Sequence, residues 1–170
     1  ESFNKCDLIP NVLADVSNID LSTKIFNQKI DFPLFLAPTS MHRLYHHDGE
    51  IASAKAAEKL GTIFSMSTMA TTSIEEIGNL TGGPKLFQLY IHKDRGLTDN
   101  LIDRCKNTGF NGLCLTVDTV VAGNRERDHR TGFSTPPRLT LGSLLSFALH
   151  PGWSLNYLIK GKFKLANIIH

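Results

Sequence analysis

Polar side chains that could do chemistry stand within or just after short apolar runs of this chain. Gln88 and Tyr90 interrupt the run KLFQLYI, and Thr116 and Asp118 stand at the end of the run GLCLTV. A buried amide or phenol must find hydrogen-bonding partners, and a bound ligand could supply them. We therefore favour a binding or catalytic role for Gln88 and Tyr90 over a purely structural one.

Residues of the same kind follow two earlier apolar runs. Thr39 and Ser40 come shortly after FPLFLA, and Ser67 and Thr68 come after TIFSM. Barrel enzymes place their catalytic groups at the carboxyl ends of strands, so this placement is informative. Small polar residues also end strands by capping the next helix, and that is the interpretation we favour for residues 71–73.

The framework that must position these residues is predicted from the alternation of apolar runs and helical patterns. Short β-prone runs predict buried strands at 32–37, 62–66, 85–91 and 112–117. Helical spacing and capping residues predict helices at 50–60, from Thr72 or Ser73 onward, and at 94–108. Two more short strands are expected at 12–20 and 28–30. The alternation is typical of a parallel α/β sheet.

After Asp118 this alternation stops. Residues 122–137 are rich in Gly, Asn, Arg and Pro and are predicted as a loop. Residues 141–149 then place apolar side chains on one face of a helix, which Pro151 is expected to end. The charge changes here too, because residues 1–128 carry a net charge of −3 and residues 129–170 a net charge of +5.

The composition excludes several classes of protein. With 170 residues, 41% hydrophobic and 20% charged, the chain is typical of a globular protein and unlike collagen or a coiled coil. Its three cysteines have unrelated spacings and are expected to be buried or inert thiols in a reducing cytoplasm. For His46, His47 and Asp48 a turn that leads into a helix is favoured over a metal site, and no metal is predicted. The nearly balanced charge argues against nucleic-acid binding.

Parallel α/β units close either as an open doubly wound sheet or as a (β/α)8 barrel. The first strand is followed by APTSM rather than by a glycine-rich phosphate turn, which disfavours dinucleotide binding. A barrel needs about 250 residues and eight strands. Four strands are visible here, so the sequence is shorter than the fold that it begins.

The sequence resembles the family of FMN-dependent α-hydroxy-acid oxidases and dehydrogenases, which includes glycolate oxidase, flavin-type lactate dehydrogenases and mandelate dehydrogenase. The matching stretches run in family order and are VLADVSNIDLSTKIF, FPLFLAPTSMHRL, HDGE, SMSTMATTSIEEI, FQLYIHKDR, GFNGLCLTVDT and GNRERDHRTGF. The resemblance implies a TIM (β/α)8 barrel. Residues 1–119 would form roughly its first four β/α units, and residues 120–170 would form part of the long loop after strand 4.

Carried over position by position, the resemblance implies an FMN site. The backbone of Pro38, Thr39 and Ser40 would line the flavin near its reactive N5 atom. Most relatives have Ala or Gly where Ser40 stands, so its hydroxyl bears on the reactivity of the flavin with oxygen. The side chains that would hydrogen-bond the pyrimidine ring are those of Ser67, Gln88 and Thr116.

The resemblance also implies catalytic and substrate-binding residues. Tyr90 would hydrogen-bond the substrate, and Arg125 would clamp its carboxylate with two parallel charge-assisted bonds. From the residues alone, Arg125 could equally belong to a solvated loop. Asp118 would orient and charge-stabilise a catalytic histidine. That histidine is expected in the second half of the barrel, together with a further arginine, a lysine and the phosphate site, so the chain is expected to be a fragment.

The loop after strand 4 joins an amphipathic helix to aromatic residues and to lysines that no acidic residue opposes. The amino-acid sequence of this loop resembles that of the lactate and mandelate dehydrogenase branch of the family. Such a segment can lie on an anionic membrane surface; the alternative is a lid that packs on its own barrel. We expect a cytoplasmic protein that is peripheral on the inner face of the membrane through residues 139–165.

Two functional hypotheses follow from the sequence. The first is part of an FMN-dependent L-2-hydroxy-acid dehydrogenase that oxidises L-lactate to pyruvate and passes electrons to a quinone or cytochrome chain. An oxidase of the glycolate or lactate type, which uses O2, is its close variant. The second is a non-catalytic half-barrel that binds a flavin-like or anionic ligand, or a partner chain. The unpaired sheet edges of a half-barrel favour the first, and the resemblance also implies a homo-oligomer.

Overall fold

The computed structural model describes residues 2–119, 121, 123–133, 140–160 and 163–168. The strands are β1 (Thr23–Ile25), β2 (Gln28–Ile30), β3 (Phe64–Ser67), β4 (Lys85–Tyr90) and β5 (Gly112–Thr116). The helices are η1 (Phe3–Lys5), η2 (His42–Leu44), α1 (Gly49–Lys59), α2 (Ile74–Leu80), α3 (Arg95–Asn107), α4 (Glu126–Thr131), α5 (Leu141–Leu149) and α6 (Pro151–Lys160). Strand and helix alternate from α1 to β5, so the predicted α/β class is confirmed.

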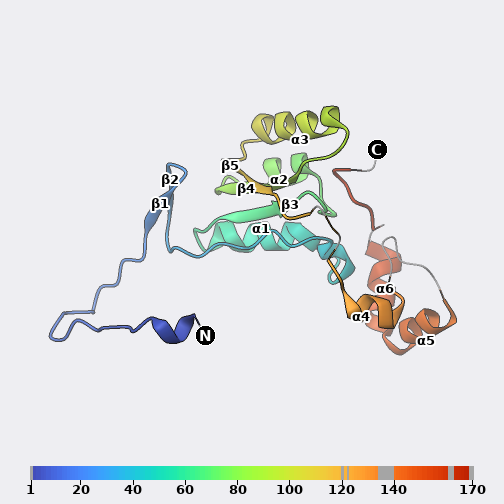
Figure 1. The fold of residues 1–170 in the computed structure, drawn as a ribbon, viewed down its shortest axis with the longest axis horizontal. Coiled ribbons are helices and arrows are strands. Elements are labelled where there is room, and N and C mark those ends of the chain that lie inside the picture. The colour runs from blue at the N-terminus through green and yellow to red at the C-terminus, as the bar shows by residue number, and fades with distance from the viewer. Residues whose placement is uncertain (1, 120, 122, 134–139, 161–162, 169–170) are drawn as a thin grey trace.

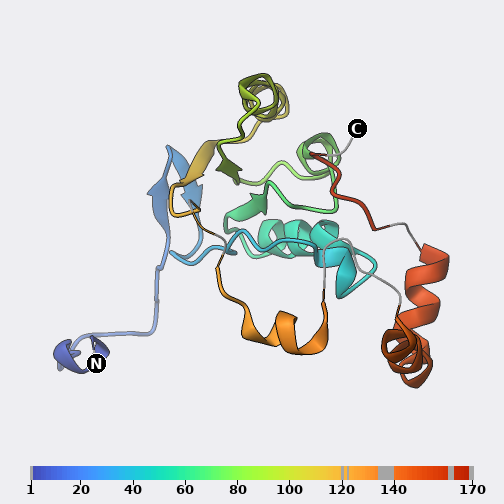
Figure 2. The ribbon, with the colours of Figure 1, turned by 45° about the vertical axis from the view of Figure 1, so that its right-hand side comes forward.

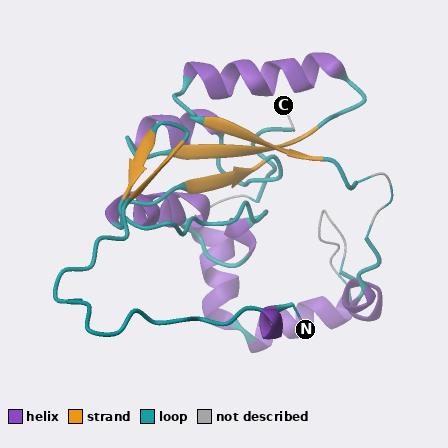
Figure 3. Ribbon diagram, turned by 60° about the vertical axis from the view of Figure 1, so that its left-hand side comes forward, coloured by secondary structure: helices purple, strands orange, loops and turns teal. Residues whose placement is uncertain are grey.

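The three strands of the central sheet run parallel (Figure 3), and their order is β3–β4–β5. Ser67 of β3 pairs with Gln88 of β4, and Gln88 pairs in turn with Cys114 of β5. Parallel pairing brings the carboxyl ends of the three strands to one edge of the sheet. The predicted strands at 62–66, 85–91 and 112–117 are therefore confirmed, with ends that differ by one or two residues.

The segment before β3 follows the sheet without forming a regular strand. Leu36 makes one parallel bridge to Phe64. The strand predicted at 32–37 is reduced to this bridge, because the backbone groups of Leu34 make hydrogen bonds outside the sheet. Its N–H closes a local turn and its carbonyl accepts from the hydroxyl of Thr62, so the ladder does not extend.

Alternation along the strands gives the sheet two chemically different faces. One face is apolar and joins the helices in a core of Ala54, Ala57, Phe64, Met66, Ala70, Ile74, Ile77, Phe87, Leu89, Leu101 and Cys105. Each large apolar side chain buried there contributes about 1.5–3 kcal/mol to folding. Because successive side chains of a strand point to opposite faces, Ser67, Gln88 and Thr116 share the other face.

The helices α1, α2 and α3 pack on the apolar face (Figure 1). α2 begins with a capping box in which the hydroxyl of Ser73 accepts from the N–H of Glu76, over 3.1 Å, and the carboxylate of Glu76 accepts from the N–H of Ser73, over 2.8 Å. Gly61, with φ 61°, follows α1, and a side chain there would collide with the carboxylate of Asp31. The predicted cap and helix stop are both confirmed.

A hairpin of β1 and β2 covers the amino end of the sheet. Ile30 of β2 is fully buried in a small core with Ile63 and Leu86. β2 confirms the strand predicted at 28–30, whereas the prediction missed β1. The two residues between them, Phe26 and Asn27, have positive φ values of 51° and 61°, which reverse the chain tightly.

The strand predicted at 12–20 is wrong. The carboxylates of Asp15 and Asp20 accept hydrogen bonds from the backbone N–H groups two residues further on, over 2.9 and 2.8 Å. These local turns use the backbone groups that a sheet ladder would need. The segment instead runs away from the sheet with its side chains exposed (Figure 1).

The region after β5 is more helical than predicted. The predicted loop at 122–137 contains α4, where Arg130 pairs with Glu126 over 3.2 Å; positions 122 and 134–137 of that loop lie outside the described residues. α5 confirms the helix predicted at 141–149. α5 ends at Leu149, just before Pro151, as predicted, and Pro151 then opens α6, because proline fits the first turn of a helix, where its missing N–H is not needed.

The end of the described chain returns to α2. The fully buried Asn167 accepts from the N–H of Ile74 over 3.0 Å and donates to the carbonyl of Thr72 over 3.2 Å. It also accepts from Arg104, which makes a two-point ion pair with Glu75 at 2.6 and 2.8 Å. That hydrogen-bonded arginine holds the pKa of Glu75 below its usual range. Residues 163–168 are thus fixed to α2 and α3.

The cysteines differ from one another. Cys105 is buried, and burial raises the pKa of its thiol to about 12, which makes it inert as expected. Cys6 and Cys114 are free and exposed, so burial does not make these two thiols inert. Among the helices that the structure describes, none is long and apolar enough to cross a membrane.

Candidate functional site

The carboxyl edge of the sheet gathers most of the predicted site residues. Ser67, Gln88 and Thr116 lie near the ends of β3, β4 and β5. The loop of Pro38, Thr39 and Ser40 reaches the same edge. The next residue, Met41, donates its N–H to the carbonyl of Met69, in the loop after β3, over 3.2 Å. Four chain segments therefore meet at one place.

Gln88 is the centre of a hydrogen-bonded row that crosses three strands. The hydroxyl of Ser67 donates to Oε1 of Gln88 over 3.2 Å, and Nε2 of Gln88 donates to the hydroxyl of Thr116 over 2.7 Å. The N–H of Thr68 also donates to Oε1, over 3.3 Å. These bonds fix the orientation of the amide while Nε2 keeps a second N–H to offer. We name Ser67, Gln88 and Thr116 the amide row.

Thr68 ties the amide row to Tyr90. Its hydroxyl donates to the carbonyl of Gln88 over 2.5 Å and accepts from the N–H of Tyr90 over 3.3 Å. Tyr90 is half-buried and stands two residues beyond Gln88, so it lies on the same face of β4. The structure thus brings the predicted substrate-contacting tyrosine next to the amide row.

The loop of Pro38, Thr39 and Ser40 is attached to α1 through a histidine. The hydroxyl of Thr39 is hydrogen-bonded to Nε2 of His42, and Nδ1 of His42 lies 3.3 Å from the hydroxyl of Ser53. Pro38 and Ser40 are half-buried and Thr39 is exposed. This attachment holds the loop backbone at the carboxyl edge, and sequence reasoning assigned no such role to His42.

Glu50 is a buried carboxylate that sequence reasoning missed. It is fully buried and accepts from the N–H of Thr71 at 2.9 Å and from the hydroxyls of Thr71 and Thr72 at 2.7 and 2.8 Å. Burial alone would raise the pKa of Glu50, but the hydrogen bonds from the two threonines outweigh it and hold the pKa below its ordinary value. The N–H of His42 also donates to this carboxylate, over 3.2 Å. Glu50 therefore connects the loop that contains His42 with the loop after β3 that contains Thr71 and Thr72.

Two predicted site residues are not hydrogen-bonded to the amide row in the described part of the chain. Asp118 follows β5 and is exposed. Arg125 is exposed and precedes α4, which forms a separate excursion from the sheet (Figure 2). Within the described part of the chain no hydrogen bond or ion pair connects either residue to Tyr90 or to the row. Their roles toward substrate and histidine stay predictions.

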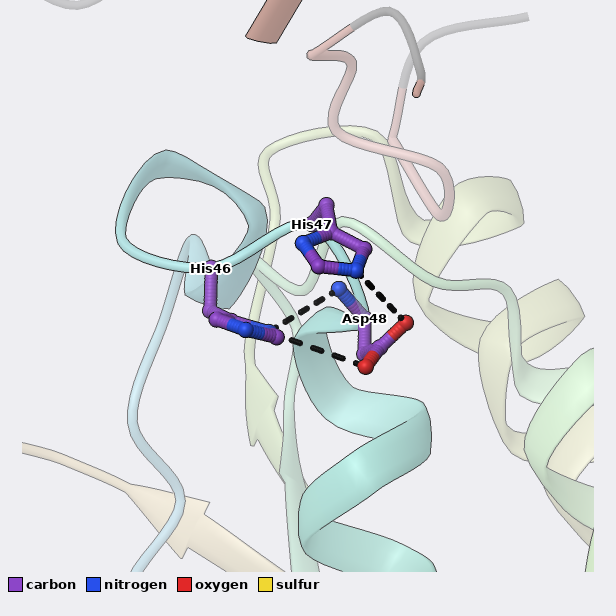
Figure 4. A group of neighbouring side chains, drawn as sticks. All are labelled: His46, His47 and Asp48. Atoms are coloured by element: carbon purple, nitrogen blue, oxygen red, sulfur yellow. Dashed lines mark hydrogen bonds and ion pairs between the residues drawn. The ribbon is translucent and has the colours of Figure 1, made fainter. Parts of the chain in front are cut away.

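His46, His47 and Asp48 converge before α1 (Figure 4). Their ligand atoms lie within 4.8 Å of one another, and Nε2 of His47 is 3.4 Å from the carboxylate of Asp48. The ammonium group of Lys160 lies 3.3 Å from the same nitrogen. A positive charge at that position opposes a bound cation, which supports the interpretation of this group as the turn into α1.

The parallel sheet, the helices on its apolar face and the polar carboxyl edge together define an α/β protein with polar side chains gathered at the strand ends. Sequence comparison identifies the family within this class. The chain belongs to the FMN-dependent dehydrogenase family, whose sequence model matches residues 1–169. The resemblance seen in the motifs is thereby confirmed, and FMN is the cofactor of this family.

Relatives of several activities are similar to the chain. It is 43% identical to glycolate oxidase 1 of Zea mays, over 83% of the chain and 38% of that enzyme. It is 45% identical to an L-lactate oxidase of Nostoc sp., over 86% of the chain and 41% of that enzyme. A solved structure of a monotopic membrane protein, (S)-mandelate dehydrogenase, superposes with a TM-score of 0.90 at 32% identity, over 99% of this chain and 45% of that one. The chain thus spans less than half the length of these relatives.

The residues at the carboxyl edge fit FMN. The pyrimidine edge of a flavin carries carbonyl oxygens and an N–H group, and the amide row offers an amide and two hydroxyls that can match both kinds of group. The loop of Pro38, Thr39 and Ser40 reaches the same edge of the sheet. When bound, FMN supplies the acceptor for the two electrons of a substrate oxidation.

Proposed function

We propose that the full-length protein oxidises an L-2-hydroxy acid with FMN, and that its substrate is L-lactate, which is converted to pyruvate. The observation that carries this proposal is the amide row at the carboxyl edge, in a chain of the FMN-dependent dehydrogenase family. We further propose that a quinone or cytochrome chain receives the electrons.

Each residue of the site has a role in this proposal. The amide row holds the pyrimidine ring, and the backbone of Pro38, Thr39 and Ser40 faces the N5 region. Tyr90 hydrogen-bonds the substrate, and Arg125 binds its carboxylate as a planar two-point donor. Asp118 orients a histidine contributed by the chain outside these residues, and that histidine takes the hydroxyl proton.

The proposal includes a complete barrel in the full-length protein. Residues 1–119 would supply about its first four units and residues 120–170 part of the loop after strand 4. Leu113 and Leu115, on the helix-facing side of β5, are 43% and 52% exposed. A following helix would cover these leucines, and a following strand would pair with the free edge of β5. The full-length protein is expected to be a homo-oligomer.

An oxidase that passes electrons to O2 is the second candidate. The identities of 45% to an L-lactate oxidase and 43% to a glycolate oxidase favour it. Ser40, whose hydroxyl would stand near the flavin, bears on the choice of acceptor. Purified full-length protein should be assayed with L-lactate and glycolate, either with an artificial dye or with air. Dye reduction without stoichiometric hydrogen peroxide supports the dehydrogenase, and stoichiometric peroxide overturns it in favour of the oxidase.

We also propose that the protein attaches to the inner face of the cytoplasmic membrane through residues 139–165. Leu155, Leu158 and Ile159 form an exposed apolar face of α6, with exposed fractions of 57%, 78% and 75%. Basic residues accompany this face, as in helices that lie on anionic membranes. The monotopic (S)-mandelate dehydrogenase superposes over 99% of the chain, which supports the same attachment.

A further inference from the structure

A cavity of about 160 Å³ lies between α6 and the turn that leads into α1. Its walls include the four basic side chains of Arg43, His46, His47 and Lys160, and the aromatic rings of Trp153 and Tyr157. The two parts of its wall are more than a hundred residues apart in the sequence. The cavity is distinct from the amide row, and neither the family nor the site above accounts for it.

The position of α6 against the turn is fixed by specific contacts. Nε1 of Trp153 donates to the carbonyl of Leu44 over 2.8 Å. The ring of Trp153 stacks on that of Tyr157, with centroids 5.1 Å apart and planes at 16°. Trp153, Tyr157 and Lys160 stand at i, i+4 and i+7, so one face of α6 forms the wall.

The polar groups of the cavity have unused donors. The ammonium group of Lys160 lies 3.3 Å from Nε2 of His47, and the carboxylate of Asp48 lies 3.4 Å from the same nitrogen. The other ring nitrogen of His47, Nδ1, and Nε of Arg43 are buried without a hydrogen-bonding partner among the residues that the structure describes. Both side chains line the cavity, so an acceptor bound there would lie close to them.

The charge of the cavity favours an anion. Arg43 and Lys160 are permanent cations at neutral pH. The facing carboxylate is that of Asp48, which lies 3.4 Å from Nε2 of His47 and 3.8 Å from Nδ1 of His46. One carboxylate does not balance these two cations. An anion with several acceptor oxygens, such as a phosphate group, matches this set of donors.

The opposite face of α6 indicates where such a phosphate comes from. Leu155, Leu158 and Ile159 lie on the face turned away from the cavity and are exposed. A helix that buries such a face lies at the boundary of acyl chains and headgroups. Because a helix with its side chains is about 10 Å across, its other face then stands among the headgroups.

We propose that this cavity binds the phosphate of an anionic phospholipid headgroup. The proposal rests on the membrane attachment proposed above and adds a specific lipid site to it. Arg43 and Lys160 would hold the phosphate oxygens, the N–H of His47 would complete the set, and Trp153 and Tyr157 would pack against the glycerol part of the lipid.

The test measures binding of the purified full-length protein to vesicles by sedimentation. Vesicles of phosphatidylcholine alone are compared with vesicles that also contain phosphatidylglycerol. Arg43→Gln and Lys160→Gln should each weaken binding to the anionic vesicles roughly tenfold, as expected for a lost charge-assisted hydrogen bond. Lys160→Arg should retain binding.

Lys164→Gln is the matched control, because it removes one exposed positive charge four residues from Lys160 and outside the cavity. Flavin content and thermal unfolding are measured for each variant, so that a folding defect is recognised. Equal loss from Lys164→Gln and Lys160→Gln would show charge attraction without a site and overturn the proposal.

Two further outcomes separate this proposal from membrane attachment itself. If both kinds of vesicle bind equally and Arg43→Gln has no effect, the proposed membrane attachment is supported and the proposed lipid site is overturned. If no vesicle binds, both proposals are overturned. Inorganic phosphate and glycerol phosphate are added as competitors, and tight binding of either in the absence of vesicles would assign the cavity to a soluble phosphate instead of a lipid.

Discussion

At the scale of single residues, Glu50 shows how a buried charge organises the site. Its carboxylate accepts three hydrogen bonds from Thr71 and Thr72 and one from the N–H of His42. The same His42 is hydrogen-bonded to Thr39, whose backbone would line the flavin. Loss of the Glu50 charge should therefore disturb both the stability of the fold and the loop at the carboxyl edge.

We expect Glu50→Gln to lower the free energy of unfolding by about 2 kcal/mol at neutral pH, because an amide replaces a charged acceptor. The pKa of Glu50 is lowered in the folded state, so its contribution is present above the ordinary glutamate pKa of roughly 4.3 and is lost as the pH falls through the folded value. Urea unfolding at several pH values measures this. The difference between the two proteins should shrink in acid.

Asp103→Asn is the control for this measurement, since Asp103 carries an exposed carboxylate with a weak surface pair to Lys106. Its unfolding free energy should stay within about 0.5 kcal/mol of the parent. A gap between Glu50→Gln and the parent that grows in acid would contradict the account of this carboxylate.

Arg125 is the second residue whose role can be measured. Arg125→Lys should raise the KM for L-lactate roughly tenfold, because a lysine cannot make the two-point bond to a carboxylate. Bound flavin should be unchanged. Arg127→Lys, the same change on the first turn of α4, is the matched control. Steady-state kinetics of the full-length protein check both variants, and unchanged kinetics for Arg125→Lys would remove it from the site.

The residue scale also shows what sequence can and cannot reveal. Gln88 was predicted because an amide inside an apolar strand must be satisfied, and the structure gives it partners on both sides. Glu50 carried no such signal, since an acidic residue in the first turn of a helix is usually explained by the helix dipole. Its burial depends on threonines that lie 21 and 22 residues away, which no local pattern encodes.

At the scale of elements, the return of residues 163–168 to α2 is held mainly by Asn167. We expect Asn167→Ala to lower the free energy of unfolding by about 2 kcal/mol, because the N–H of Ile74 and the carbonyl of Thr72 lose their partner inside the protein. Chemical denaturation measures the change. Asn107→Ala, at the exposed end of α3, should have a small effect, and equal losses from the two would contradict the assigned role.

The α5–α6 pair should be the membrane-binding element. Leu158→Asp together with Ile159→Asp should release the full-length protein from sedimented membranes, because two charges oppose burial of the apolar face. Flavin content and dye-linked turnover should be retained, and deletion of residues 139–165 should have the same result. Leu60→Asp, at another exposed leucine, is the control. Continued sedimentation of the double variant would end the proposal of attachment through α6.

Elements were predictable where a local pattern determined them. β4, α3 and the cap of α2 follow from apolar runs, helical spacing and capping residues. The segment at 12–20 failed because its aspartates form local turns that compete with strand pairing. Pro151 marks the end of α5 as predicted, but α6 was missed because the same residue also suits the start of a helix.

At the scale of the whole molecule, the near-neutral charge is the sum of two unlike regions. The part up to residue 128 is acidic and holds the sheet, its helices and the carboxyl edge, whereas the part from residue 129 is basic and holds α5 and α6. Sequence alone could predict this division, since charge and hydropathy change together. It could not predict that α6 would dock on the turn before α1 through Trp153, because that contact joins residues 109 positions apart.

The visible absorption spectrum of the full-length protein, recorded without oxygen before and after addition of L-lactate, tests the central proposal most directly. The account predicts a flavin spectrum in the purified protein and bleaching of the flavin band on addition of L-lactate, with pyruvate formed in proportion. A protein that carries FMN but keeps its band unchanged with L-lactate, glycolate and L-mandelate would contradict the proposed oxidation of 2-hydroxy acids.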